Sequence, residues 1–294
     1  MNYTKVGSLE DVAKRASSEI PPGESVVNYV VACQIDISSI LCSPLSDVEE
    51  EAKEWASREC PDHLYFNHGQ YAKGGVEYIA EELKRKPTSN RALYSLINQD
   101  DIQGSGDRPI PSFMVFQVVL QGECLYCTVY FRALEVSKFF RINLEEIRQN
   151  ICKIYNHPLV FKNVKLFIVG CRAYHTVGFN PLVRPRLDQM GVLDILSALE
   201  RSPSELGPMI REKASAHTVI ESSSLRSLLE CFQKRDISLD KKSYIISLLS
   251  DSAELSERLA YMRERHSHDS ELERISSDLS GKLLRLAEEF ESCQ

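Results

Sequence analysis

The sequence predicts an α+β protein, in which a mixed sheet with flanking helices is followed by an all-α C-terminal extension. Up to about residue 190, runs rich in β-branched and aromatic residues alternate with segments of helical apolar spacing. Beyond that point strand-like runs cease, and apolar residues recur at steps of three and four among Ser, Glu and Arg. We therefore expect two domains, 1–190 and 191–294.

The first sixty residues predict two helices around one strand. Residues 9–18 have helical spacing, and SVVNYVVACQIDI is rich in the β-branched residues that favour a strand. The segment SDVEEEAKEWASREC is typical of a helix, with Ser46 as a candidate N-cap because a serine oxygen accepts a hydrogen bond from the first turn.

A helix, a short strand and a hairpin follow. The helix is predicted at GGVEYIAEELKRK and should end before Pro87, and the apolar run ALYSLIN favours a strand. The segments FMVFQVVL and LYCTVYF have strand composition and flank the turn-like QGE, so they predict a hairpin over residues 113–131. A helix at INLEEIRQNICKIY and a buried strand at VKLFIVG complete the predicted body.

The C-terminal extension predicts a set of amphipathic helices. Three are indicated over residues 225–232, 244–249 and 255–262. A final apolar seam has the spacing of a helix that packs on another helix and comprises Leu272, Ile275, Leu279, Leu283, Leu286 and Phe290. Such a seam is most often part of the chain's own core, and the alternative is a docking surface for a protein partner.

Composition limits the compartment and the partners. The chain is 43% hydrophobic and 26% charged, its net charge of -7 disfavours an extensive nucleic-acid surface, and a local basic site for one phosphate stays compatible. No apolar run approaches the ~18 residues of a membrane span, and residues 1–20 lack the apolar core of a signal peptide. Nine cysteines, several in apolar surroundings, fit a reducing compartment. We expect a cytoplasmic protein with no membrane partner.

A series of motifs runs from His68 to Asp188: LKRKPTSNRALYSLINQDD, VYFRALEV, FRINLEEI and GCRAYHT. In this order they resemble the nucleotide-binding half of thymidylate synthases and the related pyrimidine-nucleotide hydroxymethylases. The resemblance implies a thymidylate-synthase-like sheet and a homodimer, because in that family two sheets pack back to back. It does not extend past Met190, where the family has its folate-covering part, so we expect no cofactor.

The resemblance implies a site without its nucleophile. In the family a Pro-Cys-His triplet precedes a glutamine, and its cysteine attacks carbon 6 of the pyrimidine. Counting back from Gln117, which matches that glutamine, the nucleophile position holds Ser112 and the histidine position holds Phe113. A serine hydroxyl needs a nearby base to become nucleophilic, and none is identifiable in the sequence at this point.

The nucleotide-binding positions are partly kept. The family's two arginines that reach a partner's nucleotide phosphate correspond to Asn90 and Arg91, and its phosphate-binding arginine corresponds to Arg132. A guanidinium suits phosphate because it donates paired, charge-assisted hydrogen bonds. Asn143 falls where the family contacts the base and implies uracil or thymine, since an amide donates to O4 and accepts from N3.

The GCRAYHT segment adds two further positions. Tyr174 matches the tyrosine that bonds the sugar hydroxyl, and Arg172 replaces a histidine. Ala133 and Glu135 stand where the family has a serine and an aspartate. Taken singly, the arginines are ordinary surface ion-pairing residues, Asn143 is a helix cap and Tyr174 is a core aromatic.

Three other patterns favour structural interpretations. Cys124 and Cys127 lie three apart in a strand and so face opposite sides, which disfavours a metal or redox pair. His266 and His268 lie among charges between predicted helices, as solvated histidines do, and GSGDRP lacks the lysine of a phosphate-binding loop. We expect no metal site.

The residues together predict a catalytically degenerate nucleotide-binding or structural assembly subunit, which engages a partner through residues 191–294. The alternative is an active enzyme that modifies a pyrimidine nucleotide at carbon 5 or hydrolyses it, with Ser112 or a nearby cysteine as nucleophile and Glu135 or Tyr174 in proton transfer. A third interpretation is a subunit of a larger machine in which the old pocket is vestigial.

Overall fold

The computed structural model describes residues 2–104, 110–157, 159–176, 183–216, 220–234, 241–265 and 270–293. It confirms the α+β class and divides into two compact units. The first unit comprises Met1–Pro61, Phe66–Gln99 and Pro111–Phe179, and the second comprises Asp62–Tyr65, Asp100–Ile110 and Asn180–Gln294. Each unit is described by itself below.

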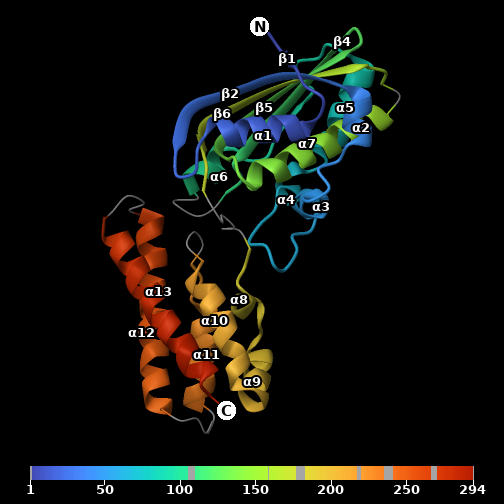
Figure 1. Ribbon diagram of the computed structural model, residues 1–294. Helices are drawn as coiled ribbons and strands as arrows, with labels where there is room; N and C mark the ends of the chain where they lie inside the picture. Colours follow the sequence, from blue (N-terminus) through green and yellow to red (C-terminus); the bar gives the residue numbers. More distant parts are fainter. Residues whose placement is uncertain are drawn as a thin grey trace. The chain divides into compact units, whose positions relative to one another are not determined.

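The first unit is built on one six-stranded mixed sheet of order β1-β2-β6-β5-β4-β3 (Figure 1). β2 and β6 are antiparallel, β6 and β5 are parallel, and β5 continues antiparallel through β4 to β3. The strands are β1 (Thr4–Lys5), β2 (Ser25–Asp36), β3 (Leu93–Ser95), β4 (Phe113–Gln121), β5 (Cys124–Glu135) and β6 (Asn163–Tyr174). The predicted hairpin is therefore present, and its two-residue turn places Gly122 at a φ of 59°.

Helices cover one face of this sheet, with α7 running beneath its middle (Figure 1). Apolar residues that alternate along β5 point toward the helices and are fully buried, as Leu125, Val129 and Phe131 show. The covering helices are α1 (Leu9–Glu19), α2 (Ile37–Cys42), α3 (Glu49–Ala56), α4 (Gly69–Ala72), α5 (Gly75–Arg85) and α7 (Phe139–Asn156). The helices predicted at 9–18, 74–86 and 142–155 are confirmed.

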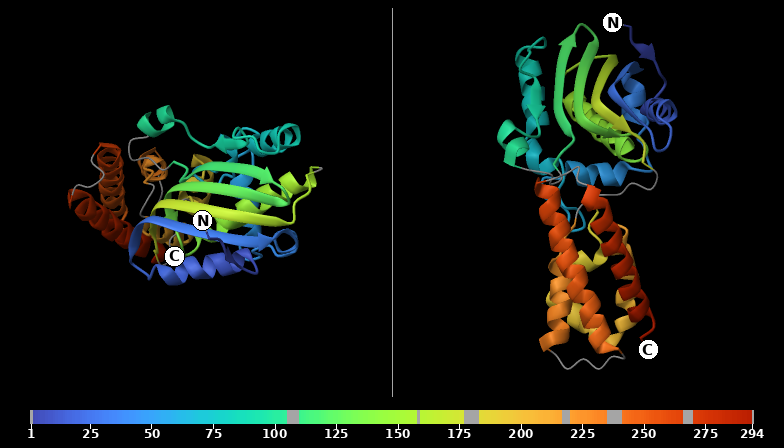
Figure 2. Two further views of the ribbon diagram at one scale, coloured as in Figure 1. Left: turned by 90° about the horizontal axis from the view of Figure 1, so that it is seen from above. Right: turned by 90° about the vertical axis from the view of Figure 1, so that its left-hand side faces the viewer.

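The opposite face of the sheet carries no helix of the described part of this unit (Figure 2). A row of apolar side chains crosses this face, because Val30 pairs with Val169, Val169 with Tyr130, and Tyr130 with Val115. Val30 is 43% exposed and Tyr130 is 37% exposed. We call this row of four residues and the sheet surface around it the open face.

The prediction of Ser46 as an N-cap is wrong. Helix α3 begins at Glu49, and Ser46 lies in the turn before it. Burial decides this start, because Leu45 and Val48 are inserted into the core and the N–H of Leu45 donates to Oε2 of the buried Glu145 at 3.0 Å. Glu145 on α7 thus holds this turn in place. A capping rule that considers only neighbouring residues does not predict such a contact.

The second unit is helical in its described part. Its helices are α6 (Gln99–Gly104), α8 (Arg186–Gln189), α9 (Val192–Arg201), α10 (Leu206–Ala214), α11 (Ser223–Lys234), α12 (Lys242–Arg265) and α13 (Ser270–Glu291), with a 3₁₀ turn at Pro203–Glu205. The predicted seam lies on α13, where Leu279, Leu283 and Phe290 are buried in the unit's own core beside residues of α10 and α12. The seam is therefore intramolecular.

A buried ion pair lies where four segments of the second unit meet. The Nζ of Lys213 on α10 lies 2.6 Å from Oδ1 of Asp188 on α8, and both side chains are almost fully buried. Asp188 also accepts from Ser224 Oγ and, at 3.4 Å, from the hydroxyl of Tyr65. The short segment Asp62–Tyr65 is held further by a β-bridge between Leu64 and Val183.

Candidate functional site

Four of the predicted site residues gather at one end of β4, β5 and β6. The backbone N–H of Arg132 donates to the carbonyl oxygen of Ser112 at 2.8 Å. Arg172 and Tyr174 lie on the adjacent β6, where Tyr174 pairs with Glu135. Burial raises the pKa of Tyr174, the charge of Glu135 raises it further, and the guanidinium groups of Arg132 and Arg172 lower it. These side chains are thus close enough to share an electrostatic environment.

The position of the family's histidine is occupied by a core aromatic. Phe113 is fully buried, and its ring centroid lies 5.2 Å from that of Phe131 and 5.7 Å from that of His68. Ser112 beside it is half-buried, and within the described residues its hydroxyl makes no hydrogen bond to a carboxylate, imidazole or amine. Activation of this serine as a nucleophile therefore has no base in the described geometry.

Glu135 caps helix α7. It is 2% exposed, and its carboxylate accepts from the backbone N–H groups of Ser137, Lys138 and Phe139 at 3.0 Å each and from that of Thr176 at 3.2 Å. The N–H groups of Ser137, Lys138 and Phe139 precede the first intrahelical bond and would otherwise lack acceptors. The acidic residue at the family's aspartate position thus fixes the β5–α7 turn.

Asn143 lies inside α7, four residues after the helix begins, so its interpretation as a helix cap is wrong. Its side chain is 2% exposed, and its Oδ1 is buried without a hydrogen-bond partner among the described residues. A buried acceptor that lacks a donor costs about 1–3 kcal/mol. The unpaired Oδ1 is thus an unusual feature, and it lies at the position predicted to contact a nucleotide base.

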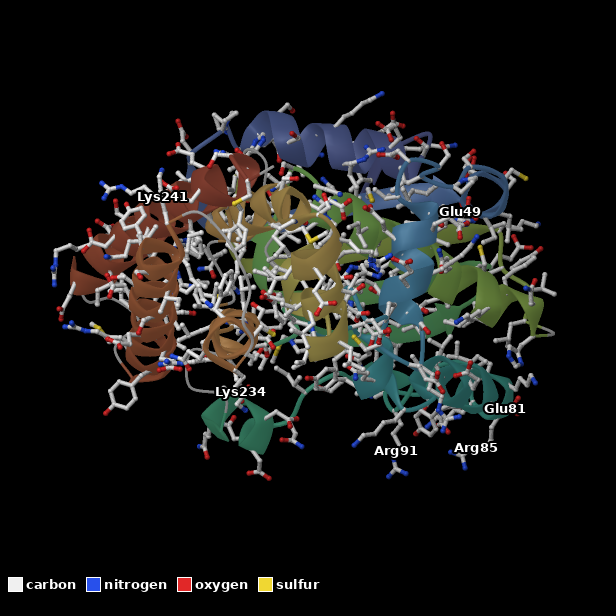
Figure 3. The ribbon with its side chains drawn as sticks, turned by 90° about the horizontal axis from the view of Figure 1, so that it is seen from below. Glu49, Glu81, Arg85, Arg91, Lys234 and Lys241 are labelled. Atoms are coloured by element: carbon white, nitrogen blue, oxygen red, sulfur yellow. The ribbon has the colours of Figure 1, made fainter. Side chains whose placement is uncertain are left out.

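Arg91 and Gln117 lie away from this cluster. Gln117 is five residues along β4 from Ser112, about 17 Å at the usual strand rise, and its Nε2 donates to the carbonyl of Asn90 at 3.0 Å. Arg91 precedes β3 and is exposed, and its side chain points away from the ribbon beside that of Arg85 (Figure 3). Within one chain these two residues do not join Arg132 and Tyr174.

A buried histidine–glutamate pair, which no motif in the sequence predicts, lies beneath the same sheet. The Nδ1 of His68 is 2.7 Å from Oε2 of Glu146 on α7, and both side chains are less than 5% exposed. The ring of His68 packs 4.9 Å from that of Trp55. The two residues are separated by 78 positions in the chain, so only their three-dimensional placement reveals the pair.

Glu146 also borders a pocket of about 710 Å³ in the first unit. The pocket lies between the start of α5, the loop before it and the turns of α7 that carry Glu146, Asn150 and Lys153. Its lining residues are Ala56, Arg58, Gly69, Gln70, Ala72, Lys73, Gly74, Gly75, Val76, Glu77, Tyr94, Glu146, Asn150 and Lys153. None of the residues predicted from the resemblance is among them.

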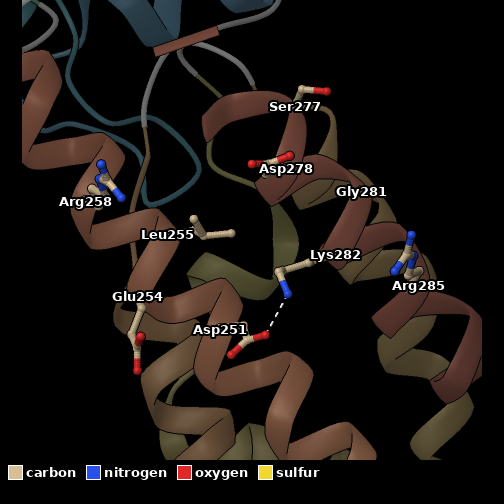
Figure 4. Close-up of a pocket in the computed structure, with 9 residues that line it drawn as sticks. All are labelled: Asp251, Glu254, Leu255, Arg258, Ser277, Asp278, Gly281, Lys282 and Arg285. Carbon is tan, nitrogen blue, oxygen red and sulfur yellow. Dashed lines mark hydrogen bonds and ion pairs between the residues drawn. The ribbon is translucent and has the colours of Figure 1, made fainter. Parts of the chain in front are cut away.

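A second pocket, of about 610 Å³, lies between α12 and α13 (Figure 4). Its walls are charged, and acids face bases across it: Lys282 on α13 points toward Asp251 on α12, with their charged atoms 2.6 Å apart. Arg258 is likewise paired with Glu271. The charges of this groove largely satisfy one another, which is typical of a solvated helix interface.

Cysteine and histidine positions do not assemble a metal site in the described residues, where no three His, Cys, Asp or Glu side chains are placed to hold an ion. Cys127 is buried in the core and Cys124 is half-exposed, since they lie on opposite faces of β5. His266, His268 and most of the GSGDRP segment lie outside the described residues.

No protein-family model matches the sequence, and the search of curated proteins found no match. Among the described residues, none of the helices has the length and apolar character needed to span a bilayer.

Proposed function

We propose that this chain is a catalytically degenerate relative of the thymidylate synthases that binds a uracil- or thymine-type nucleotide, or acts as a structural subunit, and assembles through its C-terminal helices. The orphan Oδ1 of Asn143 carries the nucleotide part of this proposal. An acceptor without a donor suits uracil or thymine, whose N3 bears a hydrogen, and does not suit cytosine, whose N3 bears none.

The grouping of charges at the ends of β5 and β6 supports an anionic ligand. Arg132 and Arg172 are exposed and both act on the pKa of the half-buried Tyr174. Two guanidinium groups near a phenol are suited to a phosphate and the hydroxyl of its sugar. The surroundings of Ser112 favour binding over catalysis, because Phe113 fills the core where a histidine would act.

Calorimetric titration with dUMP, UMP, dTMP and dCMP tests the proposal. We expect the wild type to bind uracil and thymine nucleotides and to prefer them to dCMP. Asn143→Asp should shift that preference toward cytosine, because a protonated carboxyl donates to N3. Asn143→Leu should lose nucleotide affinity while raising the free energy of unfolding by about 1–3 kcal/mol, because it removes the orphan acceptor.

Tritium release from a 5-labelled pyrimidine nucleotide separates this proposal from the active-enzyme alternative. We expect none above background, because no base is placed to activate Ser112. Release that disappears in Ser112→Ala would establish an enzyme instead. Absence of binding to all four nucleotides would leave the structural role alone.

The assembly part of the proposal rests on the exposed apolar residues of α9. Leu193 is 81% exposed and Val192 is 47% exposed, whereas the seam of α13 is already buried in the core. Sedimentation of the full chain in the presence of its copurifying proteins should show a complex that Leu193→Asp dissociates. Val160→Asp, at a 77% exposed site of the first unit, is the matched control.

A further inference from the structure

The 710 Å³ pocket of the first unit carries an excess of positive charge in an acidic protein. Arg58, Lys73 and Lys153 line it, and all three side chains are exposed. Within the described residues none of the three forms an ion pair or a side-chain hydrogen bond, although most other basic residues of this unit are paired with carboxylates. Cations left unpaired around one cavity indicate a place for an anion.

The start of α5 adds hydrogen-bond donors to the same wall. Gly74, Gly75, Val76 and Glu77 line the pocket, and the first intrahelical bond runs from Tyr78 N–H to the carbonyl of Gly74. The N–H groups of the three residues before Tyr78 therefore precede the helical ladder, and Gly74 has no side chain to cap them. The helix dipole favours an anion at this end.

The walls of the pocket are held rigidly. Asn67 is fully buried, and its Nδ2 donates to the carbonyls of Glu54 and Ser57 at 2.9 and 2.7 Å, which fixes the loop that carries Arg58. Glycine is needed at Gly69 and Gly75 for close approach: an added Cβ would lie 1.9 Å from the carbonyl oxygen of Ser57 and 2.4 Å from Cβ of Tyr94, respectively. The site is thus formed before any ligand arrives.

The inner end of the pocket is polar and buried. Tyr94 is 6% exposed, and its hydroxyl oxygen accepts from Nδ2 of Asn150 at 3.0 Å. Burial, with the nearby charge of Glu146, holds the pKa of Tyr94 well above its usual value, so the phenol keeps its proton as a donor. Glu146 itself is paired with His68. Glu77, the other lining carboxylate, is exposed at the rim and makes no hydrogen bond or ion pair with the residues that the structure describes.

We propose that this pocket is a second ligand site, which takes a small phosphate-bearing molecule with its phosphate at the start of α5 between Lys73, Lys153 and Arg58. The site is separate from the nucleotide site proposed above and shares no residue with it. The cavity volume is that of a metabolite site, and the buried hydroxyl and amide at its inner end would contact the polar part of the ligand.

Calorimetric titration of the full-length protein with inorganic phosphate at low ionic strength tests this site. We expect the wild type to bind phosphate and the double variant Lys73→Ala/Lys153→Ala to bind it at least about tenfold more weakly, the loss expected for even one charge-assisted hydrogen bond. Glu77→Gln should bind about threefold more tightly, because a like charge leaves the rim.

The matched control is Lys5→Ala/Lys86→Ala, which removes the same charge from exposed positions of the same unit outside the pocket. It should bind phosphate as the wild type does, and all variants should retain the wild-type circular dichroism spectrum. A folded wild type that binds no phosphate, or equal losses in the two double variants, would overturn the proposal. Uridine, which carries no phosphate, should bind Lys73→Ala/Lys153→Ala as it binds the wild type, so that failure of this site and failure of the nucleotide site are distinguishable.

Discussion

The carboxylate of Glu135 connects the end of β5 to the start of α7. The resemblance matches this glutamate to an aspartate of the family. In the structure its two oxygens accept N–H groups from the β5–α7 turn and from Thr176, which follows β6. Because the residue is buried, its removal leaves those donors unsatisfied and away from water.

Glu135→Ala should lower the free energy of unfolding by about 2–4 kcal/mol, as expected for loss of a buried cap with several donors. Urea denaturation monitored by circular dichroism measures the change. Glu24→Ala removes an exposed carboxylate in the loop before β2 and should stay within about 0.5 kcal/mol of the wild type. Equal behaviour of the two variants would contradict the capping role.

Substitution of two glycines by alanine should change the free energy of unfolding in opposite directions. Gly75→Ala should destabilise the protein by about 1–3 kcal/mol, because the new Cβ would overlap Tyr94. Gly281 lies in the interior of α13 with open space around it, so Gly281→Ala should raise the free energy of unfolding by up to about 1 kcal/mol. Thermal melts of both variants give the signs, and a stabilised Gly75→Ala would rule out the close contact.

At the scale of elements, one arginine ties two helices together. Arg141 on α7 donates to Glu10 on α1 at 2.8 Å and to Asp47, before α3, at 2.6 and 3.0 Å. These hydrogen bonds lower the pKa values of Glu10 and Asp47. A folded-state pKa below the unfolded value means that the stabilisation is present at neutral pH and disappears as pH falls through the folded-state pKa.

Arg141→Met should therefore lower the free energy of unfolding by about 1 kcal/mol at pH 7, because the partners are partly exposed. The difference from wild type should shrink as pH falls below about 4.5, where the carboxylates begin to protonate. Urea denaturation at pH 7, 5 and 3.5 measures it. Arg58→Met removes an arginine that has no ion pair among the described residues and should show no such pH dependence. A constant difference for Arg141→Met would contradict the assignment.

The elements that the sequence predicted correctly are those with an uninterrupted period. β2, the β4–β5 hairpin, α5 and α7 all carry regular apolar spacing. Helix α12 was predicted as two helices and is one, because Ser252 and Ser256 occupy buried positions where the pattern requires apolar residues. The start of α7 was placed three residues late, because its cap is a glutamate that acts from the preceding strand.

The candidate site was predictable only where its residues share a motif. Arg132, Glu135 and Asn143 follow one another along β5 and α7, and their spacing could be compared with a family pattern. The His68–Glu146 pair and the pocket beside it depend on distant segments that meet beneath the sheet. A single sequence contains no local signal for such contacts.

At the scale of the whole molecule, the open face bears on the oligomeric state. Val30, Val115, Tyr130 and Val169 form a continuous apolar row on a sheet surface without a covering helix in its described unit. Sheets that lack such a cover pack face to face about 10 Å apart. Burial of this row against a second copy would also bring Gln117, on the same side of β4 as Val115, into the interface.

The resemblance predicts a dimer that packs through the open face, and Val169→Lys should then leave the 33.4 kDa chain monomeric, because a buried, unpaired charge in the middle of the row opposes association. Sedimentation velocity measures the change. The matched control is Val160→Lys, whose site is 77% exposed and lies in the loop before β6. A wild type that sediments as a monomer at micromolar concentration would refute the back-to-back arrangement.

The short segment that carries Tyr65 has a consequence for the order in which the protein matures. Its partners Val183 and Asp188 are made about 120 residues later, which at ribosomal speed is a delay on the order of ten seconds. During that interval the segment Asp62–Tyr65 has no partner to pair with, while strands β3 to β6 are being synthesised. A polypeptide truncated between residues 176 and 183 would contain the segment Asp62–Tyr65 but lack its partners Val183 and Asp188.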